Sequence, residues 1–239
     1  MSDSVSSPTA DRIVTATAEL MRRQGYGATT VKQITAAARA PIGSLYHHFP
    51  GGKQQIAASA LRSSGAAYIQ LLPMLMDPYP DLHEAVSCAF TAAAEQIEQS
   101  GWMNMCPVGT VAGEIADSEP ELRTVTAEVI DDWMNRGSAY FRTRGLAPDA
   151  ARGFTAAVLG ALEGAFILSR TLRSTAPLIS AGHAMAAYLD TLPTVEIDTP
   201  AMMSRSPESG RTSRSAPGNA GPSGPVASVR TARMGQEFE

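Results

Sequence analysis

A short run of small and polar residues near residue 45 has the composition of a surface that meets a polyanion. Ile42-Gly43-Ser44 places small side chains where a phosphate backbone can approach closely. Tyr46 and His47 follow one helical turn later and carry polar tips that can reach base edges. Gly51-Gly52-Lys53 then opens another helix and offers free backbone N–H groups and an ammonium to a phosphate. The chemistry expected here is non-covalent recognition of nucleic acid.

Other residue types that carry out chemistry occur without the partners they need. Cys106 has no histidine or other base near it in the sequence, which disfavours a nucleophile. A metal site is disfavoured because no two of the histidines have the spacing of ligands on one helix together with a carboxylate partner. The four histidines are His47, His48, His83 and His183. Glu114 and Glu163 as a catalytic pair are an alternative, although a buried acid in a helical domain more often orients a ligand or caps a neighbouring helix. We therefore expect no enzyme activity, no cofactor and no metal.

The charge of the chain is divided unevenly. The net charge of −4 over 239 residues argues against a protein coated in nucleic acid. Residues 11–62, however, hold seven basic side chains against two acidic ones, whereas residues 63–198 hold seven arginines against 17 acids. This pattern predicts one face for a polyanion and a body that repels it. The two cysteines cannot form a disulfide framework, which favours a reducing compartment, the cytoplasm.

The elements that must position these residues are predicted to be helices throughout, because no segment alternates strictly in polarity. A first helix is expected to end at Gly25, and Thr30-Val31-Lys32-Gln33 is a capping box that opens a second. Only Arg39-Ala40-Pro41 separates this second helix from a third at 41–49, where Leu45 and Phe49 would anchor it to the core. Two short helices with so tight a joint indicate a helix-turn-helix.

Further helices are predicted from about residue 52 to the Pro73 region and at 81–100, 107–116, 119–144, 148–172 and 176–191. The expected fold is all-α with about nine helices. The expected domains are a disordered arm at 1–8, a helix-turn-helix domain at 9–56, a helical domain at 57–192 and a disordered tail at 193–239. The apolar run at 154–172 contains Glu163 and Arg170, so we expect a buried helix and no membrane partner.

At this point a family resemblance is visible. The segment GSLYHHFPGGKQQI, within residues 11–62, resembles the DNA-binding domain of the TetR family of transcriptional repressors. The two glycines after Phe49-Pro50 resemble the LmrA/YxaF-like subgroup, as do the later stretches CPVGTVAGEIADSEPELR and ALEGAFILSR. The resemblance covers about 11–190 and implies a homodimer whose subunits each carry an N-terminal reading domain and a C-terminal effector-binding and dimerisation domain.

The resemblance also implies which residues meet double-stranded operator DNA. Carried over by position, they are Thr30, Lys32, Arg39, Ile42, Gly43, Ser44, Tyr46, His47 and Lys53. Three of the surrounding positions depart from the family pattern: Arg39 stands where glycine is common, Pro41 where a Ser or Thr cap is common, and Ile42 where a base is common. We expect Ile42 to contact a thymine methyl instead, and Arg39 to restore the lost charge from the turn.

A site for a small hydrophobic or aromatic effector is expected in the C-terminal domain. Its candidate residues are Trp102, Met103, Cys106, Glu114, Trp133, Tyr140 and Phe166, with Glu114 or Glu163 as the polar anchor. Simple core packing is the alternative for each of them. Helices 148–172 and 176–191 are expected to form the dimer, because Gly160 and Gly164 allow close helix approach.

The function predicted from these features is a ligand-responsive repressor that binds a palindrome-like operator as a dimer and controls an efflux or catabolic gene. A transcriptional activator and a ligand-independent DNA-binding protein are alternatives, and a small-molecule enzyme is a further, weaker one.

Overall fold

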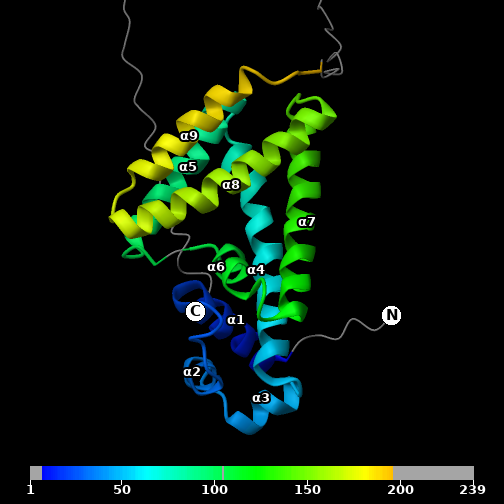
Figure 1. Cartoon of the computed structure of the whole chain (residues 1–239), viewed down its shortest axis with the longest axis vertical. Helices are drawn as coiled ribbons and strands as arrows, with labels where there is room; N and C mark the ends of the chain where they lie inside the picture. Colours follow the sequence, from blue (N-terminus) through cyan, green and yellow to red (C-terminus); the bar gives the residue numbers. More distant parts are fainter. Residues whose placement is uncertain (1–6, 104, 196–239) are drawn as a thin grey trace, which may run out of the picture. The chain divides into compact units, whose positions relative to one another are not determined.

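The computed structural model describes residues 7–103 and 105–195, which form helices connected by short turns (Figure 1). The helices are α1 (Pro8–Gln24), α2 (Val31–Ala37), α3 (Ile42–His48), α4 (Gly52–Met76), α5 (Leu82–Gln99), α6 (Pro107–Ile115), α7 (Pro120–Thr143), α8 (Pro148–Leu172) and α9 (Ala176–Leu189). Within the described residues the only strand-like pairing is one antiparallel bridge between Leu146 and Thr194. The predicted all-α fold is confirmed, and each predicted helix agrees with an observed one to within a few residues.

Helices α1, α2 and α3 form a small head with its own core, which we call the head core. It consists of Ile13, Ile34, Ala38, Ala40, Leu45, Phe49 and Ile56. The predicted capping box is present: the Thr30 hydroxyl accepts from the Gln33 N–H at 3.3 Å, and the Gln33 side chain accepts from the Thr30 N–H at 2.9 Å. The capping box therefore fixes the start of α2, and the spacing of apolar residues on α2 and α3 makes both helices pack against α1.

Helix α4 is the long element that leaves the head and enters the C-terminal domain. It runs unbroken past the expected domain boundary at 56/57 and through Pro73. Arg144 holds the end of α4 and the loop after it: it donates to the carbonyl oxygen of Met76 at 3.3 Å, the last residue of α4, and to those of Tyr79 at 2.7 Å and Pro80 at 3.3 Å in the loop. One guanidinium thus ties the end of α4 to the end of α7.

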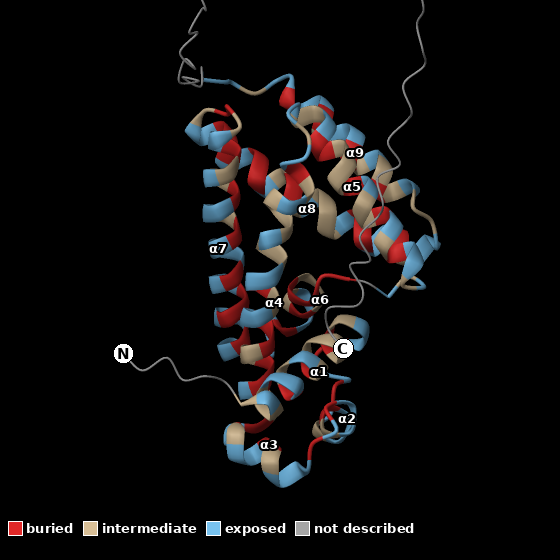
Figure 2. Cartoon of the chain, turned by 180° about the vertical axis from the view of Figure 1, so that it is seen from behind, coloured by how far each residue is buried: buried red, intermediate tan, exposed pale blue. Residues whose placement is uncertain are grey.

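Two apolar clusters hold the C-terminal domain together. A distal core joins α5, α8 and α9 with the end of α7, and its large members include Phe90, Phe141 and Phe154. A joint core lies around α6 and combines residues of α1, α4, α6 and α7, among them Met21, Leu61, Val111 and Trp133. Buried residues accordingly lie on the inward face of α7 and exposed ones on its outer face (Figure 2). Because the joint core includes α1, the head is packed directly against the C-terminal domain.

The end of the described chain is fixed to the α7–α8 turn. The Ala147 N–H donates to the Pro193 carbonyl at 3.0 Å, and the Val195 N–H donates to the Gly145 carbonyl at 2.9 Å. The tail expected from residue 193 therefore starts with three residues that pair with the body. The rest of that tail, 196–239, and most of the expected N-terminal arm, 1–6, lie outside the described residues.

Helix α8 is, within the described residues, the one helix long and apolar enough to cross a membrane. Its mean hydropathy is 1.4 and one third of the apolar window is buried. In the structure α8 packs against α5, α7 and α9. A core helix of a helical domain has the same composition.

Candidate nucleic-acid interface and ligand site

Helix α3 presents one apolar face inward and one small, polar face outward. Leu45 and Phe49 are buried in the head core. On the other face Ile42 is 59% and Tyr46 48% exposed, and a Cβ added at Gly43 would meet nothing within 4 Å. His47 is exposed as well. This is the geometry that a recognition helix needs to enter a major groove, because its outer face is narrow at the start and carries polar groups one turn later.

The turn between α2 and α3 contains Arg39, which stands where glycine is common in the family, and its backbone conformation shows why glycine suits this position. Arg39 has a φ of 49°, in the left-handed region where glycine is favoured. The Ala40 N–H closes the turn by donating to the Thr35 carbonyl at 3.0 Å. A left-handed arginine costs about 1–2 kcal/mol relative to a residue in the right-handed region. Its side chain remains exposed beside α3, where its charge is available to phosphate.

The predicted contact residues on α2 and α4 differ in how free they are. Lys32 is exposed. The Thr30 hydroxyl is already part of the capping box. Lys53 points toward the turn that follows α1: its Nζ lies 4.0 Å from the centroid of the Tyr26 ring and 3.5 Å from the Gly27 carbonyl oxygen. Partial burial lowers the pKa of this ammonium, while the carboxylates of Glu114 and Glu119 act in the opposite direction.

Lys53→Ala is expected to weaken binding to operator and to random DNA alike, because an ammonium at the start of α4 contacts phosphate rather than bases. The logarithmic salt dependence should flatten by about one unit per half-site. Filter binding or fluorescence anisotropy at several salt concentrations measures this slope. The same slope in wild type and variant would show that Lys53 serves only to join the head to the body.

Of the predicted effector residues, Cys106 and Trp133 lie in the joint core. The Trp133 indole stacks on Tyr68, with ring centroids 6.4 Å apart, and donates to the Gly65 carbonyl at 2.8 Å. The Tyr68 hydroxyl donates to the Met105 carbonyl at 3.2 Å. Two aromatic rings and their polar tips are thus fixed beside the start of α6.

A half-buried acid, Glu163, faces the same place from α8. The Glu163 carboxyl hydrogen-bonds the Cys106 thiol, and burial raises the pKa of both groups. The carboxyl also lies close against α6: a Cβ added at Gly109 would be 2.1 Å from one of its oxygens. Burial together with the neighbouring Glu163 and Cys106 also raises the pKa of the Tyr68 hydroxyl. This cluster, Tyr68, Cys106, Trp133 and Glu163, is the polar site inside an otherwise apolar domain.

The remaining predicted effector residues lie elsewhere. Trp102, Tyr140 and Phe166 pack in or against the distal core. Met103 is 39% exposed. The Glu114 side chain bonds to the turn after α1, at the head, and not to the polar site. Sequence reasoning did not place Tyr68 in the candidate effector site; a tyrosine within the apolar stretch of α4 was the available signal.

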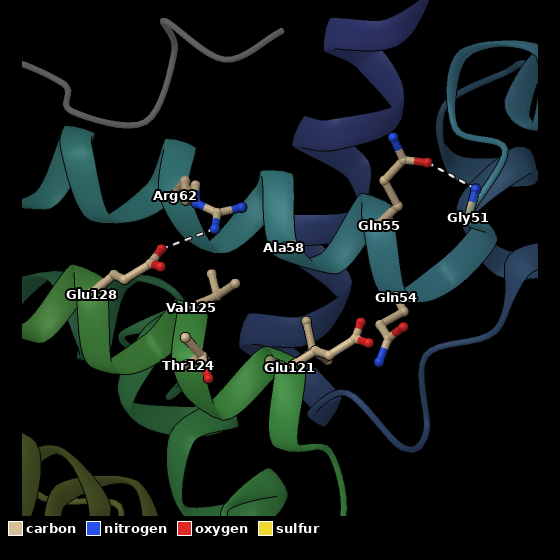
Figure 3. Close-up of a pocket in the computed structure, with 10 residues that line it drawn as sticks. Gly51, Gln54, Gln55, Ala58, Arg62, Glu121, Thr124, Val125 and Glu128 are labelled. Atoms are coloured by element: carbon tan, nitrogen blue, oxygen red, sulfur yellow. Dashed lines mark hydrogen bonds and ion pairs between the residues drawn. The ribbon is translucent and has the colours of Figure 1, made fainter.

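Two cavities among the described residues lie outside that polar site. A groove of about 500 Å³ lies between α4 and α7 and is lined by Gly51, Gln54, Gln55, Ala58, Arg62, Glu121, Leu122, Thr124, Val125 and Glu128 (Figure 3). Its ends are marked by an ion pair between Arg62 and Glu128 at 2.9 Å and by the Gln55 side chain, which accepts from the Gly51 N–H at 2.8 Å. The other cavity, of about 130 Å³, includes Tyr140 among its lining residues.

Comparison with known proteins places both parts of the chain. Residues 13–60 match the model of the bacterial regulatory proteins of the tetR family, and residues 83–184 match the LmrA/YxaF-like C-terminal domain of transcriptional regulators. The HTH-type transcriptional regulator YxaF of Bacillus subtilis is 31% identical over 169 residues, which cover 71% of this chain and 88% of that protein. The HTH-type transcriptional regulator LmrA of the same organism is 29% identical, covering 71% and 90%.

Solved structures agree on the fold. The regulatory protein TetR from Rhodobacter sphaeroides superposes with a TM-score of 0.67 at 22% identity and covers 76% of this chain and 99% of that one. Reduced NemR from Escherichia coli superposes with a TM-score of 0.61 at 19% identity, covering 79% and 99%. With an exposed recognition helix on a three-helix head, a helical body and these relatives, the chain belongs to the TetR family of helix-turn-helix transcriptional regulators, a family of non-enzymes, and carries an LmrA/YxaF-like C-terminal domain.

Proposed function

We propose that this regulator is a cytoplasmic, ligand-responsive repressor that binds a palindrome-like operator as a homodimer. The observation that carries the proposal is the outer face of α3, where Ile42, Gly43, Tyr46 and His47 stand exposed on a helix anchored by buried side chains. Each subunit offers one such helix. Two of them related by a two-fold axis read two half-sites, and a dimer bound over a promoter blocks transcription.

The dimer is supported by an exposed apolar stripe on α8. Leu168 and Leu172 are 54% and 63% exposed, and they continue, at spacings of four residues, a row that begins with Gly160 and Gly164. A Cβ added at either glycine would meet nothing within 4 Å. On α9 the adjoining surface is made mostly of small residues, with Tyr188 37% exposed. Small residues beside large apolar ones suit close packing of α8 and α9 against their two-fold mates as a four-helix bundle.

The effector is supported by the polar site around Glu163. Stacked aromatic rings suit a planar apolar compound, and the Glu163 carboxyl, whose pKa is raised by burial, offers a polar anchor for a hydrogen bond. A neutral ligand could hydrogen-bond this carboxyl, and a cationic ligand could pair with its charged form. A strongly anionic ligand is disfavoured, because residues 63–198 hold 17 acids against seven arginines.

Release from the operator requires that the effector bind more tightly to the dimer whose reading heads are badly spaced. The coupling expected for such a switch is about 5–150-fold in operator affinity. By linkage, operator DNA must weaken effector binding by the same factor. Trp133 stacks on Tyr68 at the polar site, so its fluorescence reports directly on a ligand that enters there.

The test begins with footprinting of the purified protein on DNA flanking its own gene, where a protected palindrome is expected. Flavonoids and cationic dyes are then titrated with tryptophan fluorescence in the presence and absence of that operator. Weaker binding in the presence of operator supports an inducible repressor. Equal affinities would contradict induction by that compound, and a promoter that becomes more active on binding would favour the alternative, an activator.

A further inference from the structure

The side chain of Glu114 joins α6 to the turn that follows α1. Its Oε2 accepts from the Tyr26 N–H at 2.7 Å and its Oε1 accepts from the Gly27 N–H at 2.6 Å. Both oxygens of one carboxylate are therefore used by two consecutive backbone N–H groups. Hydrogen bonds to an ionised carboxylate are shorter and stronger than neutral ones, and two parallel bonds also fix the orientation of the groups that make them.

The turn is built of residues that leave room for this carboxylate. A Cβ added at Gly25 would lie 2.4 Å from Oε2, and one added at Gly27 would lie 2.6 Å from Oε1. Gly25 also has a φ of 79°, which other residues adopt only with strain. The sequence Gly25-Tyr26-Gly27 thus supplies two exposed N–H groups with no side chain in front of the carboxylate.

Further contacts make the turn a fixed point of the head. The Thr29 hydroxyl donates to the Gly25 carbonyl at 2.7 Å, and α2 begins two residues after Thr29. Lys53 at the start of α4 bonds the Gly27 carbonyl and covers the Tyr26 ring. On the other side of α1, Arg170 of α8 donates to the Arg23 carbonyl at 3.0 Å. Figure 1 and Figure 2 show α6 between α1 and α8.

We propose that Glu114 is a positioning residue for operator binding, which sets the orientation of α1–α3 on the body and thereby the spacing of the two recognition helices in a dimer. The inference rests on the proposed dimeric function. Glu114 lies on α6, its hydrogen bonds go to the turn after α1, and its charge acts on Lys53 from a distance. Its effect is therefore on geometry and not on contact with bases.

Orientation matters only when both half-sites are bound at once. Once one head is bound, binding of the second head is an intramolecular step. Its equilibrium constant rises as the second head is restricted to orientations that match the second half-site. A head that is no longer held by Glu114 samples more orientations, so the second step weakens. Binding of one head to one half-site should change little, since α3 and its core stay intact and Lys53 stays at the start of α4.

Glu114→Gln tests this inference with little change in shape, because the amide can accept only with its oxygen and places an NH₂ against the second N–H. Gly27→Ala tests it by a second route: the new methyl group pushes the Glu114 carboxylate away from the turn without changing Glu114 itself. Asp117→Asn is the matched control: it removes one exposed carboxylate three residues further along the chain. Three duplexes are compared: the operator, the operator lengthened by two base pairs between half-sites, and a single half-site.

For Glu114→Gln and Gly27→Ala we expect operator affinity to fall about tenfold, half-site affinity to stay within twofold of wild type, and the penalty for the lengthened operator to shrink. Asp117→Asn should behave as wild type in all three. Equal loss on operator and half-site, or no loss on either, would overturn the positioning role.

A readout without DNA keeps the inference separate from the proposed function. In amide hydrogen exchange, Tyr26 and Gly27 should be protected in the wild type and exchange at least about tenfold faster in Glu114→Gln, while the amides of α5 and α9 stay unchanged. Unchanged exchange at Tyr26 and Gly27 would refute the contact itself, whether or not an operator is found. Failure of the wild type to bind any palindrome, with faster exchange in the variant, would instead count against the proposed function and deprive Glu114 of its positioning role.

Discussion

Leu168→Glu is expected to leave the protein monomeric at micromolar concentration and to abolish operator binding. Leu168 is 54% exposed in the subunit and belongs to the α8 stripe that we assign to the dimer. A carboxylate placed there would be buried without a partner in each of the two copies. At about 3 kcal/mol for each uncompensated charge, the dimer would be weakened by roughly 10⁴-fold. Sedimentation velocity measures the loss of the dimer, and anisotropy with labelled operator measures the loss of binding.

The control for this experiment is Met74→Glu, because Met74 is 58% exposed on α4 and lies outside the stripe. It introduces the same charge into an equally exposed apolar position and should leave both dimer and operator binding intact. The monomeric variant should also keep its helical circular dichroism, since α8 retains its contacts with α5, α7 and α9. A Leu168→Glu protein that remains dimeric would show that another face forms the dimer.

The helices could be predicted from the sequence because their signals are local. The Thr30–Gln33 capping box, the apolar spacing of Leu45 and Phe49, and Pro107, Pro120 and Pro148 at the first turns of α6, α7 and α8 each act within a few residues. The exposed face of α3 follows from the same spacing. One feature of this region could not be predicted from local chemistry alone. Arg39 takes a left-handed conformation because the short turn between α2 and α3 requires it, despite the cost for a residue with a Cβ.

The polar contacts of the C-terminal domain could not be predicted in the same way. Glu114 was expected to anchor an effector, yet its partners are backbone N–H groups 87 and 88 residues earlier in the chain. Backbone donors have no signature in a side-chain pattern. The glycines on either side of Tyr26 leave room for the carboxylate, but in the sequence they indicated only the end of a helix. Glu163 gave a clearer signal, since an acid in the middle of an apolar helix has to find a partner in the core.

The polar site itself depends on contacts between four helices. Tyr68 of α4 and Trp133 of α7 are 65 positions apart in sequence and stack only because α4 and α7 run side by side. Cys106 and Glu163 meet because α8 crosses the start of α6 close enough that Gly109 has no space for a Cβ. Neither meeting follows from periodicity, which fixes the inward face of a helix but not the residue it faces.

Tyr46→Ala is expected to reduce operator affinity about 100-fold while leaving affinity for random DNA nearly unchanged. Tyr46 is 48% exposed on the outer face of α3, and a Cβ added at Gly52 would lie 3.4 Å from its Cε1, so the side chain is placed by the start of α4 and directed away from the core. A good base contact contributes about 1–3 kcal/mol of discrimination, and a loss of about 1.4 kcal/mol at each of two half-sites gives the 100-fold effect. Because Leu45 and Phe49 keep the helix anchored, the melting temperature should stay within a few degrees of the wild type.

The conservative variant Tyr46→Phe separates the two ways in which this side chain can act. If the hydroxyl hydrogen-bonds a base edge or phosphate, Tyr46→Phe should lose most of what Tyr46→Ala loses; if the ring packs on a thymine methyl, it should bind nearly as well as wild type. Met74→Ala, on the exposed surface of α4 and outside the proposed dimer interface, is the control for loss of an exposed side chain far from α3. Equal weakening of operator and random DNA by Tyr46→Ala would assign Tyr46 to the phosphate backbone. No weakening of either would exclude Tyr46 from the DNA interface and leave Ile42, Gly43, Ser44 and His47 as the groups of α3 that meet the groove.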